Sequence, residues 1–384
     1  MFMAQSQTTL NTEIVLWMPP FQFLLLPIPK LPNDVIIEIL TWLPVKSLLK
    51  FKCVCTSWRA LISSQRFIKA HLDNSKLAPN SAHDMIAFNC PGNLKQCSVS
   101  SMLYESVSQV FDLSLPLYSL KGFKVEGSCN GLLLMTLSKR QTILWNPCTR
   151  TYKKLPHFGV EIAEDYYPDY DLGYDKSSDD YKVVGFFDNF TDLSDVIVVV
   201  YSLKNDEWKR IKNINGRNVK AGRAAFANGK LYYFTYPDYK YRSDWNILSL
   251  DLEKEEEYET LQMPSYVKLG DHSSLAVSEG SLFLLCTHLT CADVWMLDGS
   301  SVGIENWTKV VTMPCCPDGG WKYNRTMLLY VLKNGLVMFR GATFVVYNAK
   351  DGSFRYPRIR NTGESLSVGV YTYVESLVSP VGMG

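Results

Sequence analysis

The chain has 384 residues and a formal net charge of +1. Hydrophobic residues make up 47% of it and aromatic residues 13%, enough to build one small unit and a large core. A near-neutral chain with 20% charged residues lacks a general electrostatic affinity for nucleic acid or anionic membranes, so we expect protein partners. The ten cysteines are scattered and many lie in apolar segments, which favours reduced, buried thiols over disulfides.

Residues 1–30 include an apolar segment, IVLWMPPFQFLLLPIP at 14–29, that prolines interrupt at 19, 20 and 27. The segment is shorter than a membrane span and lacks a basic leader and a small-residue cleavage site. We expect an irregular extension without stable membrane insertion, in a cytoplasmic and/or nuclear protein. A membrane or targeting element is the alternative.

Residues 31–72 are predicted to form three short helices. The first has the spacing of an apolar helical stripe, at Val35, Ile36, Ile39, Leu40 and Leu43. Pro44 begins a second helix, and a third follows the break at Thr56 and Ser57. A unit of about forty residues seldom buries enough surface to be stable alone, and Ile37 and Trp42 lie off the main stripe. We therefore expect this unit to bind a partner.

The same stretch resembles an F-box. The resemblance is carried by LPNDVIIEIL at 31–40, LP at 43–44, SLLKFKCVC at 47–55 and SWRALI at 57–62. It implies docking on a Skp-type adaptor, which links the chain to cullin and RING subunits. The residues that it assigns to the adaptor face, or to shaping it, are Leu31, Pro32, Ile36, Ile39, Leu40, Leu43, Pro44, Leu48, Val54 and Trp58. An ordinary helical hairpin and a three-helix DNA-binding unit are the alternatives; the third helix has no basic stripe for a groove.

A polar linker is expected over 73–84, and strands begin after it, at 85–89, 96–102 and 108–113. A turn glycine followed by an apolar strand then recurs at Gly131, Gly229, Gly280 and Gly335. Gly229 and Gly280 are 51 residues apart, and the interval from Gly131 to Gly229 is 98, so one unit with a degraded turn belongs near Asp179. The repeat length is therefore near fifty residues.

A second marker, an aromatic residue after a polar turn, has the same period at Trp208, Tyr258, Trp307 and Phe354. A period near fifty with about four short strands per unit is typical of propeller blades. The predicted fold is a small all-α unit followed, over 85–377, by an all-β propeller of roughly six four-stranded blades, with a tail at 378–384. The sixth blade combines strands at 85–127 with a last strand at 367–377. We expect Trp145, Trp208, Tyr258 and Trp307 to pack between blades.

These repeats are similar to the kelch-type, F-box-associated interaction domain of plant F-box proteins, a group that includes S-locus F-box-like proteins. The similarity is carried by SCNGLLLM at 128–135, LWNPCTRTYKKLP at 144–156 and LGYDKSSDDYKVVGF at 172–186. A departure is that the one Gly-Gly pair, at 319–320, is out of phase with the blades. The resemblance implies a non-catalytic substrate-recognition subunit of an SCF-type cullin-RING ubiquitin ligase. A stand-alone propeller that binds proteins or glycans is the alternative.

Two sequence patterns resemble a catalytic or a metal site but occur in an unsuitable context. Residues 299–303 fit the G-x-S-x-G pattern around Ser301, but a nucleophile elbow needs a following helix, and a strand is expected there. Cys286, His288 and Cys291 offer only three ligands in a strand-like segment. We expect no catalytic residue, no metal and no cofactor.

Target binding is expected in three long connections, at 161–170, 235–245 and 313–325, because exposed Tyr, Trp and Arg dominate protein interfaces. The candidates are Tyr167, Tyr170, Tyr239, Tyr241, Arg242, Trp321 and Arg325.

Overall fold

The structure is a computed structural model. It describes residues 31–77, 84–90, 93–115, 123–138, 141–158, 166–189, 197–211, 219–236, 246–255, 258–264, 272–298, 306–314, 326–360 and 369–381. The chain divides into two compact units, residues 1–40 and 41–384. The predicted extension at 1–30 lies outside the described residues.

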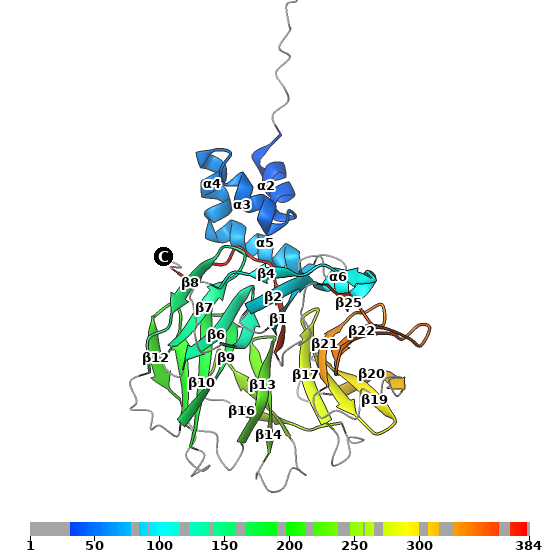
Figure 1. The fold of residues 1–384 in the computed structure, drawn as a ribbon. Coiled ribbons are helices and arrows are strands. Elements are labelled where there is room, and N and C mark those ends of the chain that lie inside the picture. The colour runs from blue at the N-terminus through cyan, green and yellow to red at the C-terminus, as the bar shows by residue number, and fades with distance from the viewer. Residues whose placement is uncertain are drawn as a thin grey trace, which may run out of the picture. The chain divides into compact units, whose positions relative to one another are not determined.

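Four helices precede the first strand: α2 (Asn33–Thr41), α3 (Val45–Phe51), α4 (Thr56–Ser63) and α5 (Gln65–Leu77) (Figure 1). Helix α5 extends to Leu77, so Asp73–Leu77 is helical where a linker was predicted. The Ser64 hydroxyl accepts a hydrogen bond from the N–H of Phe67, 3.3 Å, in the pattern of an N-cap. The face that α5 buries includes His71 and Ser75 as well as apolar residues, which weakens its apolar stripe in the sequence.

Six four-stranded antiparallel sheets form the propeller, which confirms the predicted architecture (Figure 1). Two blades are β5 (Lys124–Cys129), β6 (Leu132–Ser138), β7 (Gln141–Asn146) and β8 (Thr151–Lys154), then β9 (Tyr166–Asp175), β10 (Asp180–Asn189), β11 (Ile197–Ser202) and β12 (Glu207–Arg210). The next is β13 (Val219–Ala227), β14 (Lys230–Tyr236), β15 (Asn246–Asp251) and β16 (Tyr258–Leu261). Two more are β17 (His272–Ser278), β18 (Ser281–Thr287), β19 (Cys291–Asp298) and β20 (Asn306–Pro314), then β21 (Met327–Val331), β22 (Leu336–Arg340), β23 (Phe344–Asn348) and β24 (Ser353–Arg355).

The sixth sheet, here called the closing blade, joins the two ends of the propeller sequence. Strand β26 (Val370–Val374) pairs antiparallel with β1 (Asp84–Cys90), with Ile86 opposite Thr372, and β2 (Asn93–Ser98) and β4 (Phe111–Leu113) complete the sheet. The predicted pairing of the last strand with the first blade is therefore confirmed. Residues 124–127 belong to β5 in the next blade rather than to the closing blade.

Residues Val99–Tyr104 form helix α6, where a strand over 96–102 was predicted. The Ser98 hydroxyl accepts the Ser101 N–H at 2.9 Å, and Val99, Met102 and Leu103 are buried at the i, i+3, i+4 spacing. A short parallel pair, β3 (Val107–Ser108) with β25 (Arg358–Ile359), follows it.

The recurring glycines occupy the turns between the first and second strands of their blades. Gly131, Gly229, Gly280 and Gly335 all have positive φ, between 77° and 94°, a region in which glycine carries no steric penalty. In the β9–β10 turn the corresponding residue is Asp179, with φ of 54°, which confirms the predicted degraded turn.

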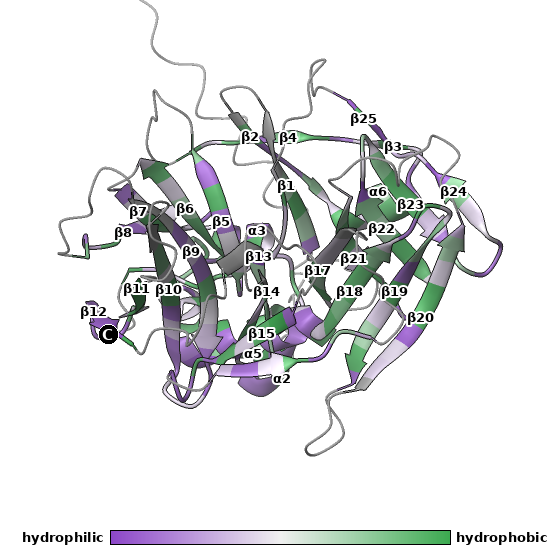
Figure 2. Ribbon diagram, turned by 90° about the horizontal axis from the view of Figure 1, so that it is seen from below, coloured by the Kyte–Doolittle hydropathy of each residue, from purple (hydrophilic) through white to green (hydrophobic). Residues whose placement is uncertain are grey.

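The aromatic markers pack between blades as predicted. The indole N–H of Trp208 donates to the Pro156 carbonyl at 2.7 Å, and that of Trp307 to the Gln262 carbonyl at 3.0 Å, each acceptor following the preceding blade. Trp145 is buried in a cluster with tyrosines of β26, and Tyr258 packs on the cluster shared by β11 and β14. In Figure 2, which views the propeller from below Figure 1, hydrophobic residues run along the strands around the ring.

Candidate protein-interaction sites

Helix α2 and the residues before it display apolar side chains to solvent. Leu31 is 56% exposed and Ile39 50% exposed, and Pro32 is also exposed. Ile36 is half-buried, whereas Leu40 is 2% exposed and belongs to the interior. Exposed aliphatic residues gathered on one short helix indicate a surface that a protein partner covers.

Helices α3 and α4 separate into buried and exposed apolar residues in the same way. Leu48 and Ile62 are fully buried, whereas Val54 is 62% exposed and Pro44 is exposed. Trp58 is half-buried, and its ring packs edge-to-face on Phe51 at 5.5 Å. Of the ten predicted adaptor residues, Leu40 and Leu48 can therefore only shape the surface from inside.

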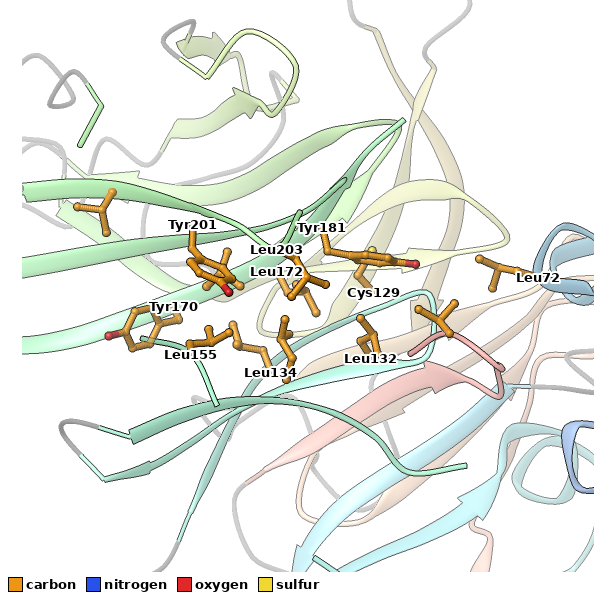
Figure 3. Packing of buried hydrophobic residues seen from close by; sticks show 14 of the residues in the cluster. Leu72, Cys129, Leu132, Leu134, Leu155, Tyr170, Leu172, Tyr181, Tyr201 and Leu203 are labelled. Atoms are coloured by element: carbon orange, nitrogen blue, oxygen red, sulfur yellow. The ribbon is translucent and has the colours of Figure 1, made fainter. Parts of the chain in front are cut away.

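Helix α5 contacts both the residues just before α3 and the propeller, all within the unit of residues 41–384. The side chains of Asn74 and His71 hydrogen-bond to Thr41 Oγ1 at 2.8 Å and to the Leu43 carbonyl at 2.9 Å. On its other side, Lys69 forms an ion pair with Asp179 in the β9–β10 turn, and Leu72 joins a core cluster with residues of β5 and β10. Figure 3 shows Leu72 at the edge of this cluster, next to Cys129 and Tyr181.

These contacts distinguish the two ends of the propeller. We call the end with the glycine turns, where α5 packs, the turn face, and the opposite end, where the innermost strands begin, the loop face. The first strand of each blade runs from the loop face to the turn face, and β26 does the same in the closing blade.

The strand ends next to the predicted target-binding connections all lie at the loop face. The flanking strands begin or end at Tyr166, Tyr236, Asn246, Pro314 and Met327. Each of these residues begins a first or third strand or ends a second or fourth strand of its blade, and all such ends lie at the loop face. Tyr239, Tyr241, Arg242, Trp321 and Arg325 lie outside the described residues, as does the side chain of Tyr167.

The prediction for Tyr170 is wrong. Tyr170 lies within strand β9, is 8% exposed, and packs edge-to-face on Phe187 at 6.0 Å and against Trp208 at 6.1 Å. Burial raises the pKa of its hydroxyl to about 12, against a hydrogen bond from Thr142 that lowers it. The charged neighbours in the sequence suggested a loop, but Tyr170 lies in a strand where Phe187 and Trp208 cover its ring.

The interior of the ring holds a cavity of about 2100 Å³. At the turn face, α5 contributes Ile68, Lys69 and Leu72 to its lining, and the cavity continues along the innermost strands to residues near the loop face, such as Thr326 and Arg340. These lining residues share no signal in the sequence, because the ring brings them together from blades far apart in the chain.

Of the two chemical motifs, only Cys286, His288 and Cys291 lie among the described residues. The residues around Ser301 lie outside them, and the described elements on either side are strands β19 and β20. Cys286 is buried in the core, and no group of three or more His, Cys, Asp or Glu suited to a metal ion occurs among the described residues. No helix in the described ranges is long and apolar enough to cross a membrane.

Comparison with known families identifies the class. The model for the F-box associated beta propeller domain matches residues 91–380, and the F-box domain model matches residues 28–70. The chain therefore belongs to the F-box proteins that carry an F-box-associated propeller, which confirms the resemblance seen in the sequence.

Individual relatives come from a plant. The chain is similar to the F-box/kelch-repeat protein At3g23880 of Arabidopsis thaliana, with 28% identity over 364 residues that cover 91% of this chain and 96% of that protein. It is also 29% identical to the F-box protein CPR1 of Arabidopsis thaliana over 320 residues, which cover 74% of this chain and 73% of that protein.

Proposed function

We propose that this chain is the substrate-recognition subunit of an SCF-type cullin-RING ubiquitin ligase. In this role the F-box binds a Skp-type adaptor, and through it the cullin and RING subunits, while the propeller binds a target protein. The observation that carries the proposal is the presence of both domains in one chain, supported by family matches over residues 28–70 and 91–380.

The exposed apolar residues of the helical region are the direct adaptor contacts in this proposal. They are Leu31, Pro32, Ile39, Pro44 and Val54, with the half-buried Ile36, Leu43 and Trp58 contributing their accessible edges. Their burial by a partner provides the apolar area and the aromatic anchor that dominate protein interfaces. Leu40 and Leu48 support this surface from the interior.

The propeller's loop face is the proposed site of target binding. Three connections rich in tyrosine, tryptophan and arginine leave strands that end there, and Tyr167, Tyr239, Tyr241, Arg242, Trp321 and Arg325 remain the candidate contacts. Since α5 packs on the opposite turn face, a target at the loop face meets no obstruction from it. The chain then acts by proximity, because it raises the effective concentration of target lysines near the conjugating enzyme.

Co-elution of the full-length chain with a purified Skp-type adaptor tests the adaptor role. The variant is Ile39→Asp combined with Val54→Asp, since both side chains are at least half exposed. We expect the adaptor affinity to fall by at least about a hundredfold, because each change places a charge in an apolar interface.

The matched control is Leu289→Asp, in the β18–β19 turn of the propeller, where the leucine is 92% exposed. It introduces the same charge and should bind the adaptor like the unmodified protein. If only the double variant's binding is unaffected, so that it binds as well as the unmodified chain, Ile39 and Val54 are not adaptor contacts. If the unmodified chain does not bind the adaptor, the ligase role falls. A stand-alone propeller that binds proteins or glycans is then the better reading.

A further inference from the structure

Strand β26, which closes the ring, is held along its inner edge by side chains from two other blades. It stands at the end of its sheet and pairs with β1, so its other edge faces the cavity that Val370–Val374 line. On this edge the Thr372 carbonyl accepts a hydrogen bond from Ser128 Oγ of β5 at 2.6 Å, and the Val370 carbonyl accepts one from the Arg223 guanidinium of β13 at 3.2 Å. Carbonyl groups two residues apart point to the same side of a strand, so both bonds satisfy the edge that β1 does not cover.

Arg223 reaches this edge from the opposite side of the ring. The blade of β13 and the closing blade have two blades between them in either direction around the ring. The pairing of β13 with β14 is irregular where Arg223 lies: three residues of β13, with Arg223 in the middle, stand between Ala221 and Ala225 opposite a single residue of β14. A bulge of this kind bends a strand and redirects its side chains. The bulge therefore accounts for the reach of Arg223 across the cavity.

Arg223 is held at both its backbone and its guanidinium. The N–H of the next residue, Ala224, donates to Asp171 Oδ1 of β9 at 3.1 Å, which fixes the bulge. At the other end the guanidinium donates to the Tyr371 hydroxyl, and its central carbon lies 3.9 Å from the centroid of the Tyr371 ring. A cation over a tyrosine ring is attracted to the face of the ring, and more strongly where water is excluded. Tyr371 is only 6% exposed, so the contact with Arg223 is well shielded.

The other charged groups that act on Tyr371 come from β5 and are paired with acidic or basic neighbours. Burial raises the pKa of the Tyr371 hydroxyl, and the Arg223 guanidinium is the strongest influence in the opposite direction. Glu126 and Lys124 also act on this hydroxyl, but they form an ion pair with each other at 2.7 Å, and Lys124 pairs with Asp169 at 2.6 Å. The Glu126 carboxylate is thus paired within β5, while the hydrogen bonds of Arg223 described above go to β26.

We infer that Arg223 is a latch for closure of the ring: from the opposite blade it holds the loop-face end of β26, so that β26 stays paired with β1. Arg223 and Tyr371 are 148 residues apart in the chain, so their contact forms only when the last strand has joined the ring. The inference concerns a conformational device of the propeller itself and goes beyond the proposed ligase role. Tyr371 provides the ring on which the guanidinium stacks, and Ser128 holds the next inward-facing carbonyl of the same edge.

Hydrogen exchange of the full-length protein, followed by mass spectrometry, tests the latch because it reports the opening of each blade separately. The variant is Arg223→Met, which keeps a long side chain but removes its charge and its donors. We expect the amides of β1 and β26 to exchange at least about tenfold faster than in the unmodified protein, because β26 loses both the stacked cation and a charged hydrogen bond. The blade of β17–β20 is the internal reference, and its exchange should change by less than about twofold.

Two further variants connect the effect to the contact itself. Arg223→Lys keeps a positive charge near the ring but loses the planar donors, so it should accelerate exchange in the same strands by a smaller factor. It also provides the comparison should Arg223→Met fail to fold. Tyr371→Phe removes the hydroxyl that accepts from Arg223 and should accelerate exchange more in the unmodified protein than in the Arg223→Met background, because the two groups act through one contact.

The matched control is Arg210→Met, the same substitution at an exposed arginine that ends β12. It should leave the exchange of β1 and β26 unchanged. Three results overturn the inference: unchanged exchange of β1 and β26 in the Arg223 variants, acceleration confined to the blade of β13–β16, or equal acceleration in every blade. An equal effect of Tyr371→Phe in both backgrounds also contradicts it, because Arg223 and Tyr371 would then act independently.

Discussion

The side-chain amide of Asn146 donates a hydrogen bond to the carbonyl oxygen of Ser376, at 3.0 Å, although 230 residues separate them in the chain. The same amide nitrogen donates to the Val378 carbonyl at 2.7 Å, and Ser376 Oγ donates to the Asn130 carbonyl at 2.7 Å. The segment after β26 is thereby fixed to the β5–β8 blade, next to the pairing of β26 with β1 that closes the ring.

Replacing this amide should destabilise the closed ring. Asn146 is fully buried, so Asn146→Ala leaves two buried carbonyl groups without their donor. We expect a loss of about 2 kcal/mol in the free energy of unfolding, measured by urea denaturation.

The matched control is Asn348→Ala. Asn348 ends the third strand of its blade, as Asn146 does, but its amide donates only locally, to Asp351 at 2.8 Å, at an exposed position. A cost for Asn146→Ala no larger than that of Asn348→Ala would contradict the closing role of Asn146.

Gly131 and Gly229 allow a comparison of two glycines with nearly the same backbone. Their φ values are 85° and 80°, so alanine is strained at both positions. An added Cβ at Gly131 would overlap Ser376 Oγ and lie 2.8 Å from the Val374 carbonyl, whereas at Gly229 no atom lies within 4 Å. We expect Gly229→Ala to cost about 1–2 kcal/mol and Gly131→Ala at least about 1 kcal/mol more, by the same denaturation measurement. Equal costs would show that the C-terminal segment does not restrict Gly131.

Repeating local chemistry explains why the propeller could be predicted from the sequence. Gly131, Gly229, Gly280 and Gly335 mark the same turn because L-residues rarely adopt their backbone conformation. The outer-strand aromatics, such as Trp208, keep the same period because each packs toward the preceding blade. The glycine signal depends on residues adjacent in the sequence, and the aromatic signal depends on a fixed repeat length.

The features that the sequence did not predict depend instead on how distant parts of the chain pack together. Tyr170 and the adjacent Asp171 are both buried, so burial along β9 does not alternate as it would in a strand with one exposed face. Helix α5 buries His71 and Ser75, so hydropathy alone did not identify its packed face. Arg223 meets Tyr371 only because the ring closes, and nothing near Arg223 in the sequence indicates that contact.

Stability and adaptor binding should respond to different substitutions in α3 and in the turn after it. Leu48 is fully buried, so Leu48→Ala removes core contacts and should cost about 2–5 kcal/mol. Val54 is 62% exposed, so Val54→Ala should change the free energy of unfolding by less than about 0.5 kcal/mol while weakening adaptor binding. Hydrogen exchange of the α3 and α4 amides measures the first effect, and adaptor titration the second. An adaptor affinity that Val54→Ala leaves unchanged would remove Val54 from the proposed contact surface.

Lys182 joins two blades through a buried ion-pair network. Its Nζ lies 3.0 Å from Asp175 Oδ2 and 2.7 Å from Glu255 Oε1, and it donates to the Leu252 carbonyl at 2.7 Å. The Lys182 side chain is 8% exposed. We expect Lys182→Met to cost about 3 kcal/mol or more in the free energy of unfolding, because it leaves a buried carboxylate uncompensated. Lys230→Met is the control; its ion pair with Glu259 is partly exposed and should contribute at most about 1 kcal/mol.

The same network predicts how stability depends on pH. Burial raises the pKa of Asp175, but hydrogen bonds from Ser178, Ser177 and Lys182 outweigh it, so the pKa of this carboxyl lies well below its usual range. A carboxyl whose pKa is lower in the folded state stabilises the fold above its unfolded pKa of about 4, and this contribution is lost as the pH falls through the folded value. Urea denaturation between pH 7 and pH 3 should therefore show stability falling below about pH 4, with a smaller fall in Asp175→Asn. An equal decline in both proteins would assign the acid sensitivity to other carboxylates.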